Sequence, residues 1–159
     1  MFTCMPRSLC SWEFQVSGLS TGPAILDFDF FTEYGRISIG GTEHAIRKHG
    51  ILSGHWTLEL DETTLAEAKK PNALSRTFDI RSGPTQLTVR AHTALTRRFD
   101  LFQGGETVGM IRPEHPFTRR AVIECDSSVP EAVQLFAFWL VDGGDRHAIP
   151  SPFLSRPPR

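Results

Sequence analysis

The stretch that most constrains the fold lies near the C-terminus, at residues 130–142, with the sequence PEAVQLFAFWLVD. Gln134 is the only polar side chain between Val133 and Val141. A surface helix has one apolar and one wet face, whereas a helix that is apolar all round is buried on all sides. At about 1.5 Å per residue the segment is about 20 Å long, shorter than the ~30 Å core of a bilayer. We therefore expect a helix enclosed by protein, and the short strands that precede it favour a barrel as the enclosure.

Local signals predict where this helix begins and ends. Ser128 and Glu131 have the spacing of a capping box, and Pro130 is tolerated in a first helical turn, where its missing N–H has no intrahelical partner. Gly143 and Gly144 are typical of a left-handed C-terminal stop. The segment between these signals is expected to form the centre of the core.

Length and composition limit the classes of protein to which the chain can belong. With 159 residues, of which 40% are hydrophobic and 22% charged, it is typical of a single globular domain. The net charge of −1 provides no global basic field, so we expect no nucleic-acid partner. The N-terminus lacks an apolar run of signal-peptide length, and no transmembrane segment is expected. Cys4, Cys10 and Cys125 lack metal-ligand spacing, so we expect reduced thiols and a cytoplasmic location.

Short strands are expected along most of the chain before the helix. Alternating side chains or a hairpin pattern mark the first of them, at residues 12–16, 24–31, 36–39 and 43–48. The Gly40-Gly41 pair lies between the last two and is typical of a hairpin turn. From His55 onward, strands recur about every 8–12 residues with turn residues between them, which is typical of a sandwich or barrel.

The chain is expected to divide into three parts. Residues 1–10 are interpreted as a flexible lead and residues 11–149 as a single barrel domain. Residues 150–159, PSPFLSRPPR, form a Pro-rich tail with an extended backbone, suited to binding in a groove.

An internal repeat relates residues 56–80 to residues 99–123, which follow 43 positions later without a gap. The aligned pairs are Trp56 with Phe99, Leu58 with Leu101, Thr64 with Thr107, Leu65 with Val108, Ala66 with Gly109, Leu74 with Phe117, Ser75 with Thr118, Arg76 with Arg119, and Ile80 with Ile123. Two copies are too few for a solenoid and instead indicate two pseudo-equivalent halves of one closed sheet. Closure also removes the exposed edges of so many strands.

This order of elements resembles the tubby C-terminal-like superfamily. The similar features are the W-T-L motif at Trp56, the L-A-E-A motif at Leu65, the L-S-R-x-F-x-I motif at Leu74, their repetition, and the terminal apolar helix. Within the superfamily the chain looks most like the LURP-one-related group, to which phospholipid scramblases are related. The resemblance implies about twelve antiparallel strands around a C-terminal helix. It implies little about function, because a fold does not fix a function. Tubby domains bind membrane phosphoinositides through surface basic residues, and no segment here matches the scramblase calcium-binding stretch.

Motifs for catalysis or metal binding do not have the surroundings they need. Gly18-Leu-Ser20-Thr-Gly22 matches a hydrolase elbow, but Pro23 and a strand follow it where a helix is required. Asp142 and Asp145 lack the spacing of a calcium loop, and no P-loop is found. No metal-binding spacing relates His44, His49, His55, His92, His115 and His147. We expect no cofactor, no metal and no catalytic residue.

Basic residues near strand ends and loops provide the functional hypothesis. The candidate ligand-binding residues are Lys69, Lys70, Arg76, Arg97, Arg98 and Arg119. If they share one rim, they would attract an anionic head group, each contributing about 1 kcal/mol near an anionic membrane. The alternative is structural: the same residues would protect strand edges, or Arg76 and Arg119 would pair with nearby carboxylates.

The sequence therefore predicts a non-enzymatic binding module for an anionic phospholipid or another phosphate-bearing ligand, located at a membrane periphery when bound. The alternative is a protein–protein adaptor that acts through a sheet surface or through the tail at residues 150–159. An enzyme or a lipocalin-like carrier ranks last, because the helix would fill the cavity that either needs.

Overall fold

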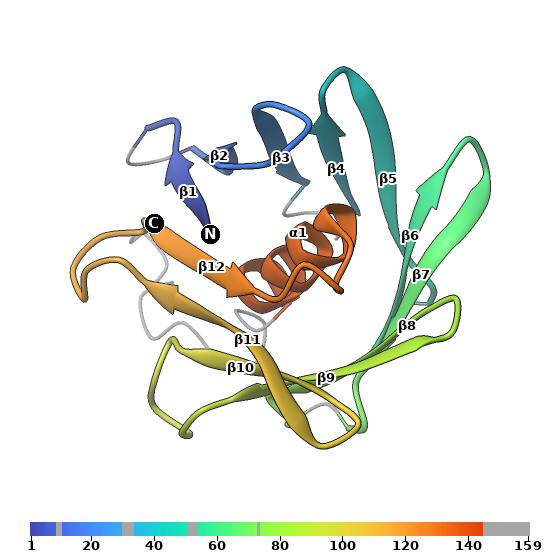
Figure 1. The fold of residues 1–159 in the computed structure, drawn as a ribbon, viewed down its shortest axis with the longest axis vertical. Coiled ribbons are helices and arrows are strands. Elements are labelled where there is room, and N and C mark those ends of the chain that lie inside the picture. Colours follow the sequence, from blue (N-terminus) through green and yellow to red (C-terminus); the bar gives the residue numbers. More distant parts are fainter. Residues whose placement is uncertain (9–10, 30–33, 51–53, 73, 145–159) are drawn as a thin grey trace, which may run out of the picture.

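The computed structural model describes residues 1–8, 11–29, 34–50, 54–72 and 74–144, and its strands form one closed antiparallel barrel (Figure 1). The strands are β1 (Phe2–Pro6), β2 (Glu13–Ser17), β3 (Ala24–Asp29), β4 (Tyr34–Ile39), β5 (Thr42–Lys48), β6 (His55–Leu60), β7 (Thr63–Lys69), β8 (Thr77–Ser82), β9 (Thr85–Ala91), β10 (Phe99–Gln103), β11 (Glu106–Pro113) and β12 (Ala121–Cys125). Each strand pairs with its neighbours in sequence, and β1 pairs with β12 to close the barrel. The predicted fold class, a closed antiparallel barrel of about twelve strands with a buried C-terminal helix, is confirmed.

The N-terminal residues correct one prediction. Residues 1–10 were expected to be a flexible lead, but Phe2–Pro6 form β1 between β2 and β12. Phe2 and Cys4 point inward and are buried, and Cys4 lies opposite both Val16 and Ala121. The segment is ordered by strands from both ends of the chain, a long-range pairing that local sequence pattern does not reveal.

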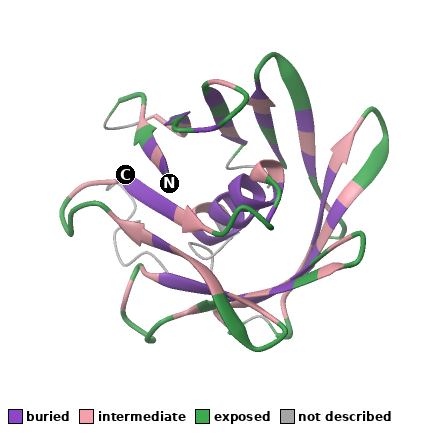
Figure 2. Ribbon diagram, in the orientation of Figure 1, coloured by how far each residue is buried: buried purple, intermediate pink, exposed green. Residues whose placement is uncertain are grey.

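Alternation of side chains explains why the strands form a filled barrel (Figure 2). In β3, Ala24, Leu26 and Phe28 are buried, whereas Ile25 and Asp29 are exposed. Because successive strand residues point to opposite faces, this pattern directs one set of side chains into the barrel and the other into solvent. Phe30 and Phe31, which were included in the predicted strand, lie outside the described residues.

The repeat is visible in the backbone. Both copies contain a β-bulge at the aligned position, between Leu58 and Glu59 and again between Leu101 and Phe102. Both also have a two-residue turn with positive φ, at residues 61–62 (φ 48° and 65°) and at Gly104-Gly105 (φ 60° and 89°). The unit β6–β7–β8 therefore matches the unit β10–β11–β12, including the irregularities.

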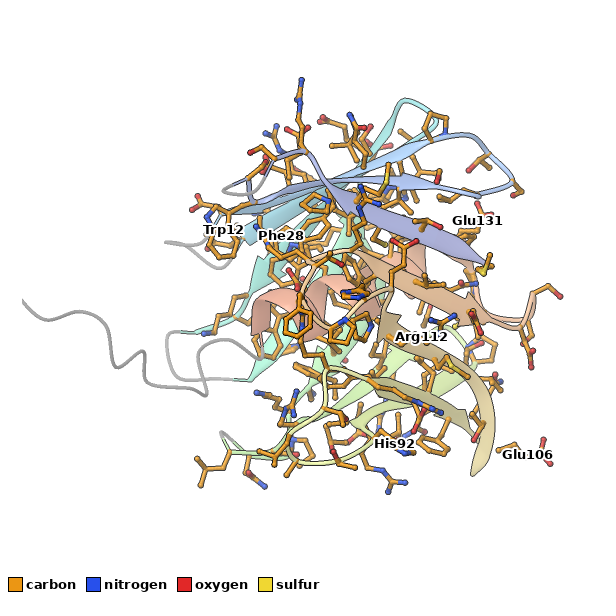
Figure 3. All side chains as sticks on the ribbon, turned by 90° about the vertical axis from the view of Figure 1, so that its left-hand side faces the viewer. Trp12, Phe28, His92, Glu106, Arg112 and Glu131 are labelled. Atoms are coloured by element: carbon orange, nitrogen blue, oxygen red, sulfur yellow. The ribbon has the colours of Figure 1, made fainter. Side chains whose placement is uncertain are left out.

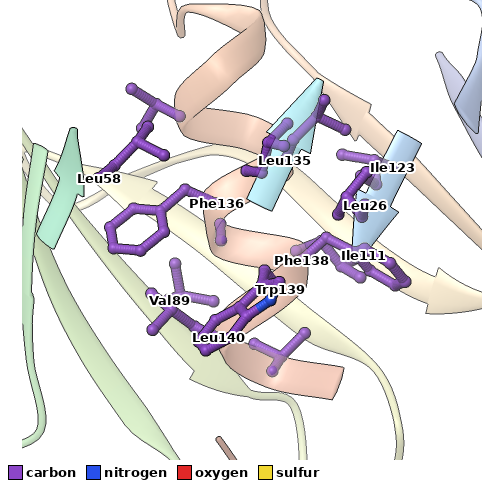
Figure 4. Packing of buried hydrophobic residues seen from close by; sticks show 14 of the residues in the cluster. Leu26, Leu58, Val89, Ile111, Ile123, Leu135, Phe136, Phe138, Trp139 and Leu140 are labelled. Atoms are coloured by element: carbon purple, nitrogen blue, oxygen red, sulfur yellow. The ribbon is translucent and has the colours of Figure 1, made fainter. Parts of the chain in front are cut away.

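The C-terminal helix lies inside the barrel (Figures 1 and 4). It comprises α1 (Glu131–Trp139) and a π-helical turn, η1 (Leu140–Gly144), and every side chain from Val133 to Trp139 is buried. Its backbone comes nearest to β3, β4 and β12. Gln134, the polar interruption, donates its side-chain amide to the Val129 carbonyl at 2.8 Å, so its burial leaves that amide satisfied.

The Trp139 side chain packs against Gly35 on the adjacent strand, β4. Its indole stacks on Phe28 with ring centroids 5.4 Å apart and an interplanar angle of 8°. Gly35 lies opposite Phe28 in the β3–β4 register, and a Cβ at Gly35 would lie 2.6 Å from Trp139 Cε2. The missing side chain of Gly35 therefore makes the space that the indole occupies.

Both predicted helix ends need correction. Pro130 is the N-cap and no side chain caps the helix, so Ser128 and Glu131 do not form a capping box. Glu131 instead accepts hydrogen bonds from Ser20 N at 2.6 Å and Thr21 Oγ1 at 3.1 Å, in the turn between β2 and β3. Gly143 has no left-handed φ, because the chain continues into η1 and Gly143 packs against Phe28.

The two ends of the barrel differ in their connections. One end, the turn end, carries short turns and the start of α1, at residues 18–23, 40–41, 61–62, 83–84, 104–105 and 126–130. The other, the loop end, carries longer connections, described at residues 7–8, 11–12, 49–50, 54, 70–72, 74–76, 92–98 and 114–120. The helix runs from the turn end to the loop end, and Figure 3 shows Trp12 of the loop end on the side opposite Glu106 and Glu131.

Candidate anion-binding site

All six predicted basic residues lie at the loop end. Antiparallel connections alternate between the two ends, so the β7–β8, β9–β10 and β11–β12 loops share one end and are neighbours around the barrel. The six residues are in or next to these loops: Lys69, Lys70, Arg76, Arg97, Arg98 and Arg119. The topology thus gathers side chains that the sequence only suggested as a group.

Charge is distributed unequally between the two ends. The described part of the loops at the loop end contains one acidic residue, Glu114, and the basic residues Arg7, Lys70, Arg76, Arg97, Arg98, Arg119 and Arg120. The turns of the turn end contain no lysine or arginine but carry Asp61, Glu62 and Asp126. A chain with a net charge of −1 therefore presents a basic surface at one end.

Three of the predicted arginines connect the loops in series. Arg76 donates from Nη1 to the Ala94 carbonyl at 2.8 Å, which joins the β7–β8 loop to the β9–β10 loop. Arg97 donates from Nη1 to the Thr118 carbonyl at 3.1 Å, and so joins the β9–β10 loop to the β11–β12 loop. Arg119 donates from Nη1 to the Ser11 carbonyl at 2.7 Å and reaches the β1–β2 loop. The hydrogen bonds therefore connect the β7–β8, β9–β10, β11–β12 and β1–β2 loops to one another.

The guanidinium groups of two of these arginines lie over aromatic rings. The Arg76 guanidinium carbon lies 5.1 Å from the Phe99 ring centroid. The Arg119 guanidinium carbon lies 5.0 Å from the Trp12 ring and 5.2 Å from the Phe14 ring. Arginine stacked on aromatic faces combines packing with a cation–π attraction. Arg76 and Arg119 thus make structural contacts with main-chain carbonyls and aromatic rings.

The remaining predicted residues have local partners. Lys69 pairs with Glu67 at 3.0 Å, and the Lys70 ammonium lies 5.1 Å from the Phe78 ring centroid. Arg98 pairs with Asp100 at 3.0 Å.

Asp100 also accepts a 2.7 Å hydrogen bond from His92. Burial alone would raise the pKa of the Asp100 carboxyl, but its hydrogen bonds with His92 and Arg98 outweigh burial and lower that pKa below its ordinary value. Arg98 is therefore neutralised locally, and Arg97 is the more available charge of this pair.

A cavity of about 190 Å³ opens between the loop end and the end of the helix. Its charged lining comprises Arg76, Arg97, Arg112 and Asp142, and its apolar lining comprises Phe99, Ile111, Pro113, Ala121, Phe138 and Val141. Arg112 pairs with Glu124 across β11 and β12 at 2.9 Å. The cavity therefore has a largely apolar lining with arginines contributed by three elements, the β7–β8 loop, the β9–β10 loop and β11.

Arg112 was not among the six predicted ligand-binding residues. The repeat aligns it with Lys69, because the two positions are 43 residues apart, and this alignment is the signal that could have identified it. Both residues belong to the outward face of their strands, because the adjacent Ala68 and Ile111 are buried, but only Arg112 is part of the cavity lining. The repeat thus predicts that both residues lie near the loop end of the barrel, but not which of them lines the cavity.

The arrangement suits an oxyanion. A guanidinium has five N–H donors in a planar fork that matches phosphate and carboxylate oxygens. A more open hollow of about 660 Å³ lies on the outer wall at β9 and β10, and Arg90 is its one charged lining residue. The cavity at the loop end is the better candidate site.

Other candidate chemistry has structural explanations. Ser20 of the elbow-like motif lies in an exposed turn that leads into β3, and its backbone N–H binds Glu131. Burial raises the pKa of the Cys4 thiol above its ordinary value, with a further contribution from Asp142, and raises the pKa of Cys125 to about 11. Among the described residues, no group of three or more His, Cys, Asp or Glu side chains could hold a metal ion.

Comparisons of the chain with protein-family models, curated proteins and solved structures give no match. The resemblance to the tubby C-terminal-like superfamily therefore stays a prediction. Within the described part of the chain, no helix is long and apolar enough to cross a membrane.

Proposed function

We propose that this protein is a non-enzymatic binding module that recognises a phosphate-bearing anion, with an anionic phospholipid head group as the favoured source, at the loop end of the barrel. The observation that carries the proposal is the cavity lined by Arg76, Arg97 and Arg112, within an end of the barrel that is rich in basic residues. The predicted resemblance to tubby-like domains points to the same class of ligand.

Electrostatics supports a membrane surface as the source of the anion. Near an anionic leaflet each lysine or arginine contributes about 1 kcal/mol, and the contribution decreases within a Debye length of about 8 Å at physiological salt. Several basic residues on neighbouring loops can act together on one leaflet, whereas a free phosphate would contact only the cavity. Binding should therefore be stronger for vesicles than for the isolated head group.

Charge reversal at one exposed position tests this proposal. The Arg97→Glu variant should lose most binding to vesicles that contain a phosphoinositide, because Arg97 lines the cavity and is exposed. Arg119 is less suitable for reversal because it is half-buried over Trp12 and Phe14. The matched control is Arg81→Glu, which makes the same charge change near the turn end of β8.

Two arms of the experiment distinguish the sources of the anion. One measures binding of the chain to vesicles, and the other measures binding of inorganic phosphate and inositol hexaphosphate in solution. Loss of both in Arg97→Glu, with Arg81→Glu unchanged, supports the proposal. Equal loss in both variants, or vesicle binding that survives in Arg97→Glu, contradicts it.

The adaptor alternative has less support. The closed barrel offers no unpaired strand edge among the described strands, so strand addition to a partner is not available there. The tail at residues 150–159 lies outside the described residues.

A further inference from the structure

We infer that the protein docks by inserting three apolar loop tips, Leu74, Leu95 and Phe117, into the interface of an anionic phospholipid bilayer. This inference rests on the proposed function and adds to it the mode of membrane attachment. The three side chains are 87%, 96% and 92% exposed. Among the described residues no other large hydrophobic side chain exceeds the 76% of Met1 at the N-terminus.

The three tips belong to three neighbouring loops of the loop end. Leu74 lies in the β7–β8 loop, Leu95 in the β9–β10 loop and Phe117 in the β11–β12 loop. These are the loops that Arg76 and Arg97 join through hydrogen bonds to the Ala94 and Thr118 carbonyls. The arginines therefore connect the three loops that carry the tips at the basic end.

Local hydrogen bonds keep each tip in a tight turn. Leu74 N–H donates to Asn72 Oδ1 at 3.1 Å, and at the aligned position of the repeat Phe117 N–H donates to His115 Nδ1 at 3.3 Å. In the third loop, Thr93 N–H donates to Thr96 Oγ1 at 3.2 Å, which closes a turn around Leu95. Such side chain-to-backbone bonds stabilise turns, so the exposed tips are held by local structure.

The spacing of the tips favours a bilayer over a protein partner. A protein interface has a contiguous apolar centre with a polar rim. Here each apolar side chain is on a separate loop. Arg76 and Arg97 each follow a tip, Leu74 and Leu95, by two residues in the same loop. A bilayer interface accepts separate apolar side chains at the level of its acyl boundary while its anionic head groups contact the basic residues between them.

The two contributions complement each other energetically. Single weak signals give marginal, reversible membrane binding, and stable attachment takes two. The basic residues supply attraction that weakens with salt, and the apolar tips supply a contribution that is insensitive to salt. Some binding should therefore persist at physiological salt in the wild type.

Quenching by brominated lipids tests insertion directly. Phe117→Trp introduces an indole at one tip, and Ile25→Trp introduces one at a 43%-exposed position near the turn end of β3. With phosphatidylcholine vesicles that contain a phosphoinositide and brominated acyl chains, only Phe117→Trp should gain quenching over the wild type. Vesicle binding without such quenching overturns the inference and leaves the proposed function standing.

A second set of variants measures the contribution of the tips. The triple variant Leu74→Ser, Leu95→Ser, Phe117→Ser should bind the same vesicles about 100-fold more weakly, whereas inositol hexaphosphate binding stays within about twofold. The control Ile25→Ser should bind vesicles like the wild type. Unchanged vesicle binding by the triple variant, or a wild-type dimer that the triple variant converts to a monomer, overturns the inference. Failure of the wild type to bind either vesicles or inositol hexaphosphate overturns the proposed function as well.

Discussion

Arg76 and Arg119, which are 43 residues apart, make equivalent contacts in the β7–β8 and β11–β12 loops, on either side of the β9–β10 loop. Each guanidinium lies over an aromatic ring, Phe99 for Arg76 and Trp12 for Arg119, and each donates to a main-chain carbonyl of the following loop. The following loop for Arg119 is the β1–β2 loop, because β1 and β12 close the barrel. The repeat therefore encodes how the loops are joined as well as where the strands lie.

Replacing Arg119 by lysine should lower the free energy of unfolding by about 1–3 kcal/mol, because lysine cannot reproduce the planar stack and the directed hydrogen bond to Ser11. Urea denaturation measures the change. The control is Arg120→Lys, next in sequence but exposed, which should alter stability by less than about 0.5 kcal/mol. Equal effects of the two substitutions would contradict the assigned role of Arg119.

Adding one methyl group at Gly35 should destabilise the protein by about 1–3 kcal/mol, because the new Cβ would meet the Trp139 indole. The test is a double-mutant cycle with Trp139→Leu, which removes Nε1, Cε2 and Cζ2, the atoms that the new Cβ would meet. In that background Gly35→Ala should cost less, by about 0.5 kcal/mol or more. Additive effects would show that the two residues do not compete for the same space.

Asp100→Asn should lower the free energy of unfolding at neutral pH and make that free energy fall less steeply as the pH is lowered. The folded pKa of Asp100 lies below its ordinary value of about 3.9, so the carboxylate stabilises the fold above that pH, and the stabilisation is lost as pH falls through the folded pKa. Thermal unfolding between about pH 2 and pH 7 should show a shallower acid decline for the variant. The exposed Asp126→Asn, at the turn end, should retain the wild-type profile.

Glu131→Gln should loosen the contact between the start of the helix and the β2–β3 turn. Burial alone would raise the pKa of Glu131, but hydrogen bonds from Ser20 and Thr21 lower it, so the ionised form is the one that the turn binds. We expect a loss of about 1–2 kcal/mol and faster hydrogen exchange of the Ser20 amide. Unchanged exchange at Ser20 would indicate that the contact does not restrain the turn.

Much of the fold could be predicted because its strongest signal is local. A helix without a polar face, such as residues 130–142, must be buried. The 43-residue repeat indicates a regular sheet around this helix. The β1 strand was missed because Phe2 and Cys4 are ordered by distant strands. The helix ends were missed because Glu131 binds Ser20, far away in sequence, in preference to its own helix.

The candidate site could be predicted only as a set of residues. Local position near strand ends left open whether these residues share a rim, and the topology places them at one end because connections alternate between the two ends of an antiparallel barrel. Local position did not distinguish Lys69, which is not part of the cavity lining, from Arg112, which is. Nor did it mark Leu95 as exposed, since exposure depends on the tertiary position of the loop.

Sedimentation of the wild-type chain with vesicles, at low and at physiological salt, tests the central claim most directly. We predict binding to vesicles that contain a phosphoinositide, weaker at physiological salt than at low salt but still measurable, and no binding to vesicles of phosphatidylcholine alone. Absence of binding to the anionic vesicles at low salt would contradict membrane recognition through the loop end.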